Sequence, residues 1–274
     1  MPTAVVTGAG SGLGRAIAHD LGQRGFLVQA TDIDADAAAR TASEVAPGAF
    51  SSALDVRDEA ACRRTVAAAI TRTGSLDVWV NNAGILSTGL SWKQDDATRR
   101  ALIEVNALGS MNGTVAALEA MVPSGRGHVI NIVSLAGLVA APGEVNYSAS
   151  KHAALGFTLG TLYDLRREGI GGVDVSAVCP DGIWTPMIED ALDDPEMAAS
   201  FSGELLTAER VAREVGRLIE RPRPLVVIPR WRNPVVRGFA LFPRLSLRLL
   251  PLVMRDARRR QRRYKKKIQS GNWP

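Results

Sequence analysis

The sequence has few of the residues that stabilise a fold through disulfide bonds or bound metals. Its 274 residues include two cysteines, Cys62 and Cys179, and three histidines that lie far apart along the chain. Two cysteines exclude a disulfide framework and a four-cysteine zinc site, and scattered histidines argue against a histidine-rich site, so we expect no bound metal. A low cysteine content suits a reducing compartment, and we therefore expect a cytoplasmic protein.

Long apolar runs and internal repeats are also missing. No window reaches the ~20 apolar residues that a membrane-spanning helix needs. The sequence opens MPTAVVTGAG, without the basic and apolar segments of a secretory signal. What is present is an ordinary globular composition, 46% hydrophobic and 22% charged, which excludes wholesale disorder.

Charge is distributed unevenly along the chain. The net charge is +5, but the segment from Arg221 to the C-terminus has 16 Lys and Arg and one acid, Asp256, a local charge of +15. By subtraction, residues 1–220 have 17 basic and 27 acidic residues, a charge of −10. An acidic body with a basic tail predicts that the tail contacts something anionic: lipid, nucleic acid or the acidic body itself.

Short apolar segments alternate with longer amphipathic ones over the first 229 residues. Short, β-branched segments that are apolar throughout are typical of parallel strands buried on both faces, with helices as crossovers. The pattern predicts a doubly wound α/β (Rossmann) domain over 1–229, with a seven-stranded parallel sheet and helices on both faces, followed by a helical basic extension over 230–274. Strands are expected at 4–7, 26–30, 49–54, 76–80, 128–133, 173–178 and 225–228, and helices at 13–23, 35–45, 58–71, 92–121, 146–168 and 208–219.

A glycine-rich turn, TGAGSGLG, joins the first strand to the first helix. Gly8, Gly12 and Gly14 follow the spacing G-x-x-x-G-x-G, which lets backbone approach a pyrophosphate at a helix amino end. Asp32 ends the second strand, where a carboxylate accepts ribose hydroxyls and repels a 2′-phosphate. No Lys or Arg follows before Arg40, which favours NAD over NADP. After the third strand, the Asp55-Val56 pair could contact the adenine, or Asp55 could cap the next helix.

The chemical site is expected on the helix after the fifth strand. Tyr147 and Lys151 are spaced i and i+4, so both side chains lie on one helix face. A neighbouring ammonium favours the phenolate, which would lower the pKa of Tyr147 and suit it to acid/base work. Ser134 closes the fifth strand, where its hydroxyl could hold a carbonyl oxygen.

Further motifs complete a set that resembles the short-chain dehydrogenase/reductase family. The fourth strand is followed by NNAG, Asn106 lies within a predicted helix, and Pro180 and Thr185 follow the sixth strand. The resemblance covers about residues 3–228 and includes TGAGSGLG, Asp32, Asp55-Val56, NNAG, Asn106, Ser134 and YSASK.

The resemblance implies a role for each matching residue. Tyr147 would be the general acid/base, Lys151 would bind the nicotinamide ribose, and Ser134 would orient the substrate oxygen. Asn106 would hold a water in the proton relay. Asp181 departs from the family's usual glycine, which puts the path of that loop in question. The implied cofactor contacts are Gly8, Ser11, Gly12, Leu13, Gly14, Asp32, Ile33, Asp55, Val56, Asn82, Ala83, Gly84, Tyr147, Lys151, Pro180, Ile183 and Thr185.

Two segments outside these motifs bear on substrate and partners. The loop 186–206 mixes apolar residues with acids, which favours a lipophilic substrate over an anionic one. The extension is punctuated by three prolines that should break it into two or three helices. Its arginines Arg237, Arg244, Arg248 and Arg255 would fall within about 20° of one line on a helix.

An apolar segment with aligned arginines, followed by the polybasic run 255–267, is typical of an interfacial membrane anchor. We expect the segment 230–267 to associate peripherally with an anionic membrane, which would place the protein at the inner membrane surface. An arm that contacts another subunit is the alternative, since family members are often homodimers or homotetramers. Nucleic acid ranks last because no aromatic stacking platform accompanies the charge.

The sequence thus predicts an NAD-dependent oxidoreductase that interconverts a secondary alcohol and a ketone on a lipophilic substrate (steroid-, fatty- or isoprenoid-like). An NADP-dependent 3-oxoacyl or carbonyl reductase is one alternative, and Asp32 argues against it. A non-catalytic dinucleotide-binding scaffold with a lipid- or nucleic-acid-binding tail is another. The Asn106, Ser134, Tyr147 and Lys151 set argues against the scaffold, which has no need of proton-relay chemistry.

Overall fold

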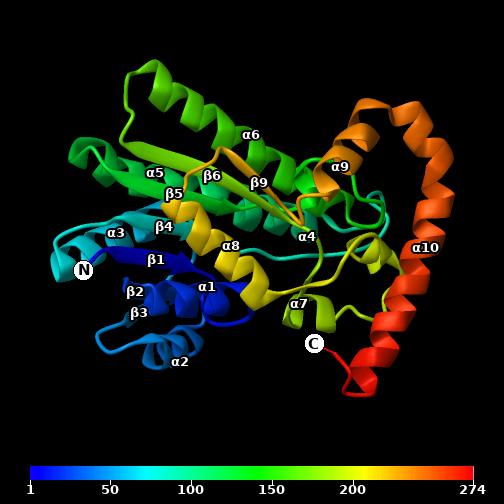
Figure 1. The fold of residues 1–274 in the computed structure, drawn as a ribbon, viewed down its shortest axis with the longest axis horizontal. Helices are drawn as coiled ribbons and strands as arrows, with labels where there is room; N and C mark the ends of the chain where they lie inside the picture. The colour runs from blue at the N-terminus through cyan, green and yellow to red at the C-terminus, as the bar shows by residue number, and fades with distance from the viewer. Residues whose placement is uncertain (274) are drawn as a thin grey trace.

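The computed structural model describes residues 1–273 of the chain. At its centre lies the predicted sheet of seven parallel strands, in the order β3-β2-β1-β4-β5-β6-β9 (Figure 1). The order reverses between β1 and β4, and such a switch point opens a crevice beyond the carboxyl ends of the strands. The strands are β1 (Thr3–Thr7), β2 (Leu27–Asp32), β3 (Phe50–Ala53), β4 (Val78–Asn81), β5 (Gly127–Ile132), β6 (Val173–Pro180) and β9 (Leu225–Ile228).

Helices cover both faces of this sheet, which explains why the central strands β1, β4 and β5 are buried. Side chains alternate along β1, so that Val6 packs toward one helical layer and Val5 toward the other. The first layer contains α1 (Gly12–Gln23), α2 (Ala35–Val45) and α8 (Ala208–Glu220), and the second contains α3 (Glu59–Thr73), α5 (Gly109–Ser124) and α6 (Val145–Arg167).

The segment expected to form one helix over 92–121 is divided in the structure. It begins at α4 (Asp96–Ile103), where Asp95 accepts a hydrogen bond from the Thr98 amide at 2.7 Å and so fixes the start. A π-helical turn over Glu104–Leu108 then separates α4 from α5. Asn106 lies in this turn, and π-turns inside helices are frequent at functional sites.

The loop expected to cover the substrate has its own small fold. The two-residue strands β7 (Ile183–Trp184) and β8 (Leu206–Thr207) pair, and α7 (Pro186–Glu189) and a 3₁₀ helix (Pro195–Phe201) lie between them. Met197 and Phe201 are fully buried in a local cluster. Part of the apolar content of this loop therefore holds the loop together rather than contacting a substrate.

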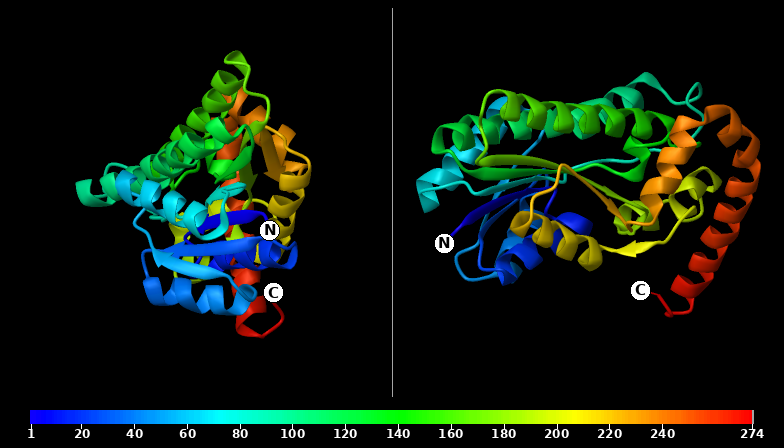
Figure 2. Two further views of the ribbon diagram at one scale, coloured as in Figure 1. Left: turned by 90° about the vertical axis from the view of Figure 1, so that its left-hand side faces the viewer. Right: turned by 45° about the horizontal axis from the view of Figure 1, so that its top comes forward.

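The C-terminal extension forms two helices, α9 (Arg232–Leu241) and α10 (Pro243–Gln269). They are joined by a sharp bend at Phe242 and make an arch beside the domain (Figures 1 and 2). Pro243 begins α10, whereas Pro251 lies inside it without ending it. The bend separates Arg237 from the arginines of α10, so the predicted single line of four arginines is wrong. Among residues 1–273, no helix combines the length and apolarity needed to cross a bilayer.

The far half of α10 is docked on the substrate loop. The Gln261 amide donates to the Leu192 and Asp194 carbonyl oxygens at 3.0 and 2.8 Å, and Lys265 forms an ion pair with Asp193. The ring of Tyr264 packs against Phe201. The basic tail therefore contacts the acidic body, which was one of the three anionic partners expected from the charge distribution.

Candidate active site

The glycine turn and the NNAG segment are held against each other at the switch point. The Thr7 hydroxyl accepts from the Asn82 and Ala83 amides, both at 3.0 Å, and the Asn82 side chain donates to the Thr7 and Gly8 carbonyl oxygens. Gly8 has φ of +62°, a conformation that favours glycine. A Cβ at Gly14 would lie 2.0 Å from the Gly8 carbonyl oxygen, so only glycine fits there.

This turn leaves an anion-binding helix end exposed to the crevice. α1 begins at Gly12, and Ser11 at its N-cap makes no side-chain capping hydrogen bond. The first-turn N–H groups of Gly12, Leu13 and Gly14 have no intrahelical acceptor, because the first four amides of any helix lack one. Free donors, the positive end of the helix dipole and glycines that leave room together fit a dinucleotide pyrophosphate.

Asp32 lines the same crevice at the end of β2. Its carboxylate accepts from the Gly10 amide at 2.9 Å and from the Asp34 amide at 3.1 Å, which fixes its orientation.

Asp55 pairs with Arg57 at 2.6 Å, and hydrogen bonds from that guanidinium hold the pKa of Asp55 below its ordinary value. The N-cap of α3 is Asp58, which accepts from the Ala61 amide, so the helix-cap interpretation of Asp55 is wrong.

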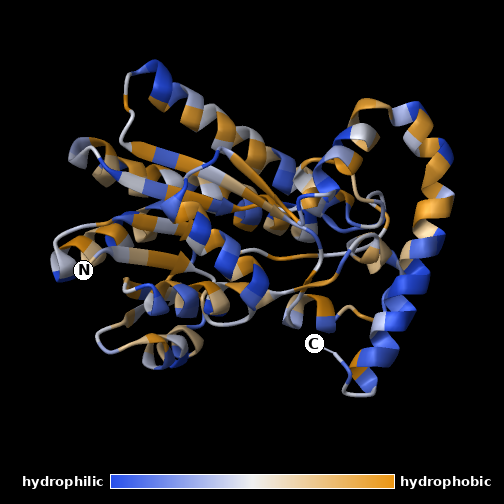
Figure 3. Cartoon of the chain, viewed as in Figure 1, coloured by the Kyte–Doolittle hydropathy of each residue, from blue (hydrophilic) through white to orange (hydrophobic). Residues whose placement is uncertain are grey.

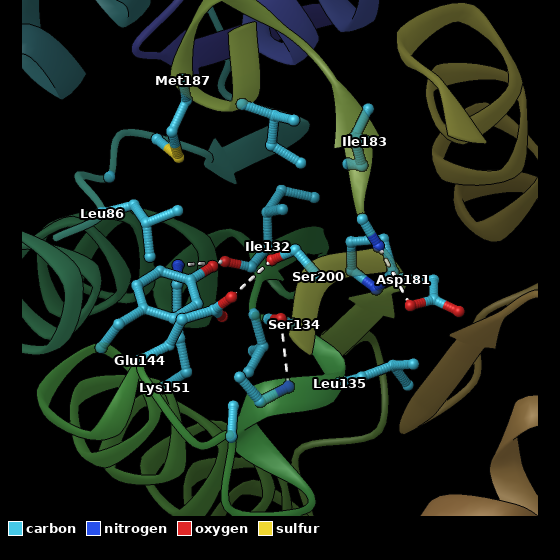
Figure 4. Close-up of a pocket in the computed structure, with 18 of the residues that line it drawn as sticks. Leu86, Ile132, Ser134, Leu135, Glu144, Lys151, Asp181, Ile183, Met187 and Ser200 are labelled. Carbon is cyan, nitrogen blue, oxygen red and sulfur yellow. Dashed lines mark hydrogen bonds between the residues drawn. The ribbon is translucent and has the colours of Figure 1, made fainter. Parts of the chain in front are cut away.

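The predicted catalytic side chains converge from β5, the π-turn and α6. The Lys151 ammonium donates to the Ile132 carbonyl oxygen at 3.0 Å and lies 5.7 Å from the centre of the Tyr147 ring. Ser134 lies beside them on the strand end, accepting from the Ala136 amide at 3.1 Å (Figure 4). A Cβ at Gly84 would lie 3.6 Å from the Lys151 nitrogen, so the NNAG turn closes around the same point.

Asn106 links the segments that carry these side chains. It is fully buried, and its side chain exchanges two hydrogen bonds with the Ile85 backbone, at 2.8 and 2.9 Å. It also donates to the Ser150 hydroxyl at 3.0 Å. Asn106 is the one predicted site residue that does not line the cavity of the site among the described residues. It joins the NNAG segment to α6, and its role in holding a water stays a prediction.

Electrostatics at the site differ from the sequence expectation. Burial and the neighbouring Glu144 carboxylate raise the pKa of Tyr147, although a hydrogen bond with Ser134 acts in the opposite direction. Burial lowers the pKa of Lys151 to about 8. The prediction of a lowered Tyr147 pKa is therefore wrong, because burial of the phenolate is the largest of these effects.

One cavity of about 980 Å³ connects these groups. The glycine turn and Asp32 line it, and so do Ser134, Tyr147 and Lys151. The predicted site residues that line it are Gly8, Ser11, Gly12, Leu13, Gly14, Asp32, Ile33, Asp55, Val56, Asn82, Ala83, Gly84, Ser134, Tyr147, Lys151, Pro180, Ile183 and Thr185.

Several polar groups outside the motifs also line the cavity, among them Glu144 and Asp181. Glu144 is buried three residues before Tyr147, accepts from the Ser200 hydroxyl at 2.7 Å, and has its pKa raised to about 7 by burial (Figure 4). Asp181, the departure from the family pattern, forms a buried ion pair with Arg232 of α9. Its backbone has no positive φ, so the loop does not require glycine there.

Part of the remaining wall comes from the extension. α9 and α10 contribute mainly apolar side chains to it, together with Arg232 and Asp256. Met187 of the substrate loop lines the cavity as well, whereas Trp184 packs against the loop's own cluster. The apolar residues from the arch are Val235, Val236, Phe239, Leu250, Leu252, Val253 and Met254.

Comparison with known proteins identifies this arrangement. Residues 2–196 match the family model described as short chain dehydrogenase. The chain is 37% identical over 224 residues to 2-(R)-hydroxypropyl-CoM dehydrogenase of Xanthobacter autotrophicus, covering 77% of this chain and 88% of that protein.

Solved structures show the same likeness. A short-chain dehydrogenase/reductase from Burkholderia phymatum in complex with NAD superimposes with a TM-score of 0.80 and 28% identity, over 89% of this chain and 95% of that one. An actinorhodin polyketide ketoreductase variant with NADPH gives 0.74 and 30%, over 83% and 95%. The chain belongs to the short-chain dehydrogenase/reductase family of oxidoreductases.

Proposed function

We propose that this protein is an NAD-dependent oxidoreductase that interconverts a secondary alcohol and a ketone within a lipophilic molecule. The observation that carries the proposal is the single cavity. Its lining includes Tyr147 and Ser134, the glycine turn, and apolar side chains of α9 and α10, and this combination supports the proposal.

The side chains divide the chemistry between them. A bound nicotinamide dinucleotide would supply or accept the hydride at the substrate carbon. Ser134 would hold the substrate oxygen, and the Tyr147 hydroxyl would give that oxygen its proton in reduction or accept it in oxidation. Lys151, fixed by the Ile132 carbonyl, would bind the ribose of the cofactor.

The preference for NAD rests on Asp32. Its oriented carboxylate would accept two ribose hydroxyls and repel a 2′-phosphate. The nearby cations are already paired, Arg15 with Glu44 at 2.6 Å and Arg57 with Asp55. The NADP-dependent reductase alternative would need at least one of these guanidinium groups to leave its carboxylate.

The lipophilic substrate rests on the composition of the cavity. Seven apolar side chains from the arch line the cavity together with Leu86, Met187 and Ile188. They outnumber the charged residues Glu144, Asp181, Arg232 and Asp256, which also line it. Burying apolar substrate surface there contributes roughly 25 cal/mol per Å², so affinity should grow with substrate length.

A chain-length series tests the proposal. Secondary alcohols from short to long, steroids and retinoids are offered with NAD and with NADP, and reduced cofactor is followed at 340 nm. The expected result is turnover with NAD and a KM that falls as apolar area increases. Faster turnover with NADP, or a preference for short polar or anionic alcohols, would contradict the proposal. Absence of turnover together with tight NADH binding would favour the scaffold alternative.

A further inference from the structure

The bend between α9 and α10 exposes a cluster of large apolar side chains. Leu241, Leu247 and Leu252 are 73%, 70% and 64% exposed, and Phe242, Leu245 and Leu249 are exposed beside them. We call residues 241–252 the apex of the arch. In Figure 3 this part of α10 is predominantly hydrophobic, whereas its docked far half is hydrophilic. The apex lies well away from the sheet (Figure 2).

The same helices present apolar side chains inward as well. Phe239, Leu250, Val253 and Met254 line the cavity, and Leu252 both lines it and is exposed. The arch is therefore apolar on its cavity side and on its outer side. A soluble surface helix is normally polar on the face away from the core. The inward side chains are accounted for by the cavity that they line. The outward leucines are exposed, and we expect them to contact a partner.

Positive charge surrounds the apex. Arg244 and Arg248 lie within it, and Arg255, Arg258 and Arg259 follow on α10. All five are exposed, and none forms an ion pair with another part of residues 1–273. The basic residues that do pair, Arg260 and Lys265, lie farther along the helix. Exposed leucines with unpaired guanidinium groups among them and after them on the same helix match the two layers of an anionic membrane surface.

We propose that the apex docks into the surface of an anionic lipid bilayer and opens the cavity toward the lipid. Leucines of the apex would enter the acyl boundary while the arginines contact phosphates. Membrane-dissolved substrate would then pass between α9 and α10 to Tyr147. Docking stands on the arch alone, and the substrate route rests on the proposed function. A bilayer is favoured over a second copy of the chain, because two-fold pairing of apices would bring their arginines together.

Flotation of the full chain with vesicles tests docking without any activity measurement. Vesicles of phosphatidylcholine alone are compared with vesicles of phosphatidylcholine and phosphatidylglycerol in equal parts. The wild-type chain should float with the mixed vesicles. The variant L241Q/L245Q/L247Q should remain behind, and none of these leucines lines the cavity. The variant R244Q/R248Q should bind mixed vesicles about 30-fold more weakly, since each basic residue near such a surface contributes about a fivefold factor.

A matched control removes the same charge elsewhere. Arg221 and Arg223 are exposed between α8 and β9, far from the arch, and R221Q/R223Q should float like the wild type. An equal loss of vesicle binding in this control would show that net charge alone drives binding. It would overturn the proposal that the apex is the docking site. Failure of the wild type to float, or a dimer that L241Q/L245Q/L247Q converts to monomer without vesicle binding, would also overturn the proposal.

The substrate route is tested on the same variants. The leucine variant should keep wild-type turnover of a short water-soluble alcohol and lose most turnover of a long alcohol dissolved in mixed vesicles. Equal turnover of the long alcohol by both proteins would overturn the route. If neither protein oxidises any alcohol, the proposed function fails while the flotation result still decides docking.

Discussion

Asp181 at the end of β6 and Arg232 at the start of α9 form a buried ion pair, with 2.9 Å between Oδ2 and Nε. Arg232 also donates to the Ser202 hydroxyl at 2.8 Å. The pair ties the cofactor-side strand to a helix that lines the cavity. The residue that departs from the family pattern thus holds the extension in place.

Removing one partner of this pair should be costly. Asp181→Asn leaves a buried guanidinium without its counter-charge, and we expect a loss of about 3 kcal/mol in the free energy of unfolding. Limited proteolysis should also cut within 230–273 sooner than in the wild type. Urea denaturation measures the loss. Asp164→Asn, which breaks an exposed pair with Arg167, is the control and should cost less than about 1 kcal/mol. A comparable small loss in both variants would contradict the structural role.

Tyr147→Phe should remove turnover and spare cofactor binding. Only the phenolic oxygen is lost, so the proton step fails while the cleft keeps its shape, and kcat should fall by at least about 10²-fold. Turnover is followed at 340 nm and NADH binding by fluorescence titration. Tyr163→Phe on the exposed side of the same helix is the matched control and should retain full activity. Full activity of the Tyr147 variant would refute its assignment as acid/base.

Asp32→Ser should shift the cofactor preference toward NADP. Loss of the carboxylate removes both the ribose acceptors and the repulsion of a 2′-phosphate. We expect the ratio of NADPH to NADH affinity to rise by about tenfold, equivalent to about 1.4 kcal/mol. Fluorescence titration with both cofactors measures this ratio. Asp36→Ser, an exposed acid on α2, should leave it unchanged. An unchanged ratio in the Asp32 variant would mean that another group selects the cofactor.

Much of the fold and the central site could be predicted because the relevant information is local. The strands are short, apolar and separated by helical segments, and the glycine turn, NNAG and YSASK each follow a strand end. All seven strands begin and end within two residues of their predicted bounds, and β9 matches at both ends. The division of the segment 92–121 could not be predicted, because apolar periodicity does not distinguish a π-turn from the α-helix around it.

Features that depend on partners distant in sequence were missed. Glu144 is buried and accepts a hydrogen bond from Ser200, and Asp181 pairs with Arg232. Neither contact produces a recognisable pattern in the sequence. The effect of Lys151 on Tyr147 was misjudged because spacing gives proximity but says nothing of desolvation. The charge of the tail was evident from composition. That the tail folds back and lines the cavity depends on the bend at Phe242 and on the hydrogen bonds of Gln261, which the sequence does not reveal.

Glu144 makes stability depend on pH in a predictable direction. Burial raises the pKa of this carboxyl to about 7 from an ordinary value of 4.5. Between these values the folded chain keeps a proton that the unfolded chain has lost. The free energy of unfolding should therefore fall as pH rises through this range. A difference of about 2.5 in pKa, at about 1.4 kcal/mol for each unit, corresponds to about 3 kcal/mol.

Glu144→Gln should remove this dependence. The amide oxygen can still accept from Ser200, but the side chain no longer ionises in a buried place. Wild type and variant should have similar stability near the ordinary carboxyl pKa, and the variant should be more stable by up to about 3 kcal/mol at pH ~8. Urea denaturation across this range gives the difference between them. Glu189→Gln, which changes an exposed acid on α7, should follow the wild type at every pH. A constant offset between wild type and the Glu144 variant would show that Glu144 stays ionised in the folded chain.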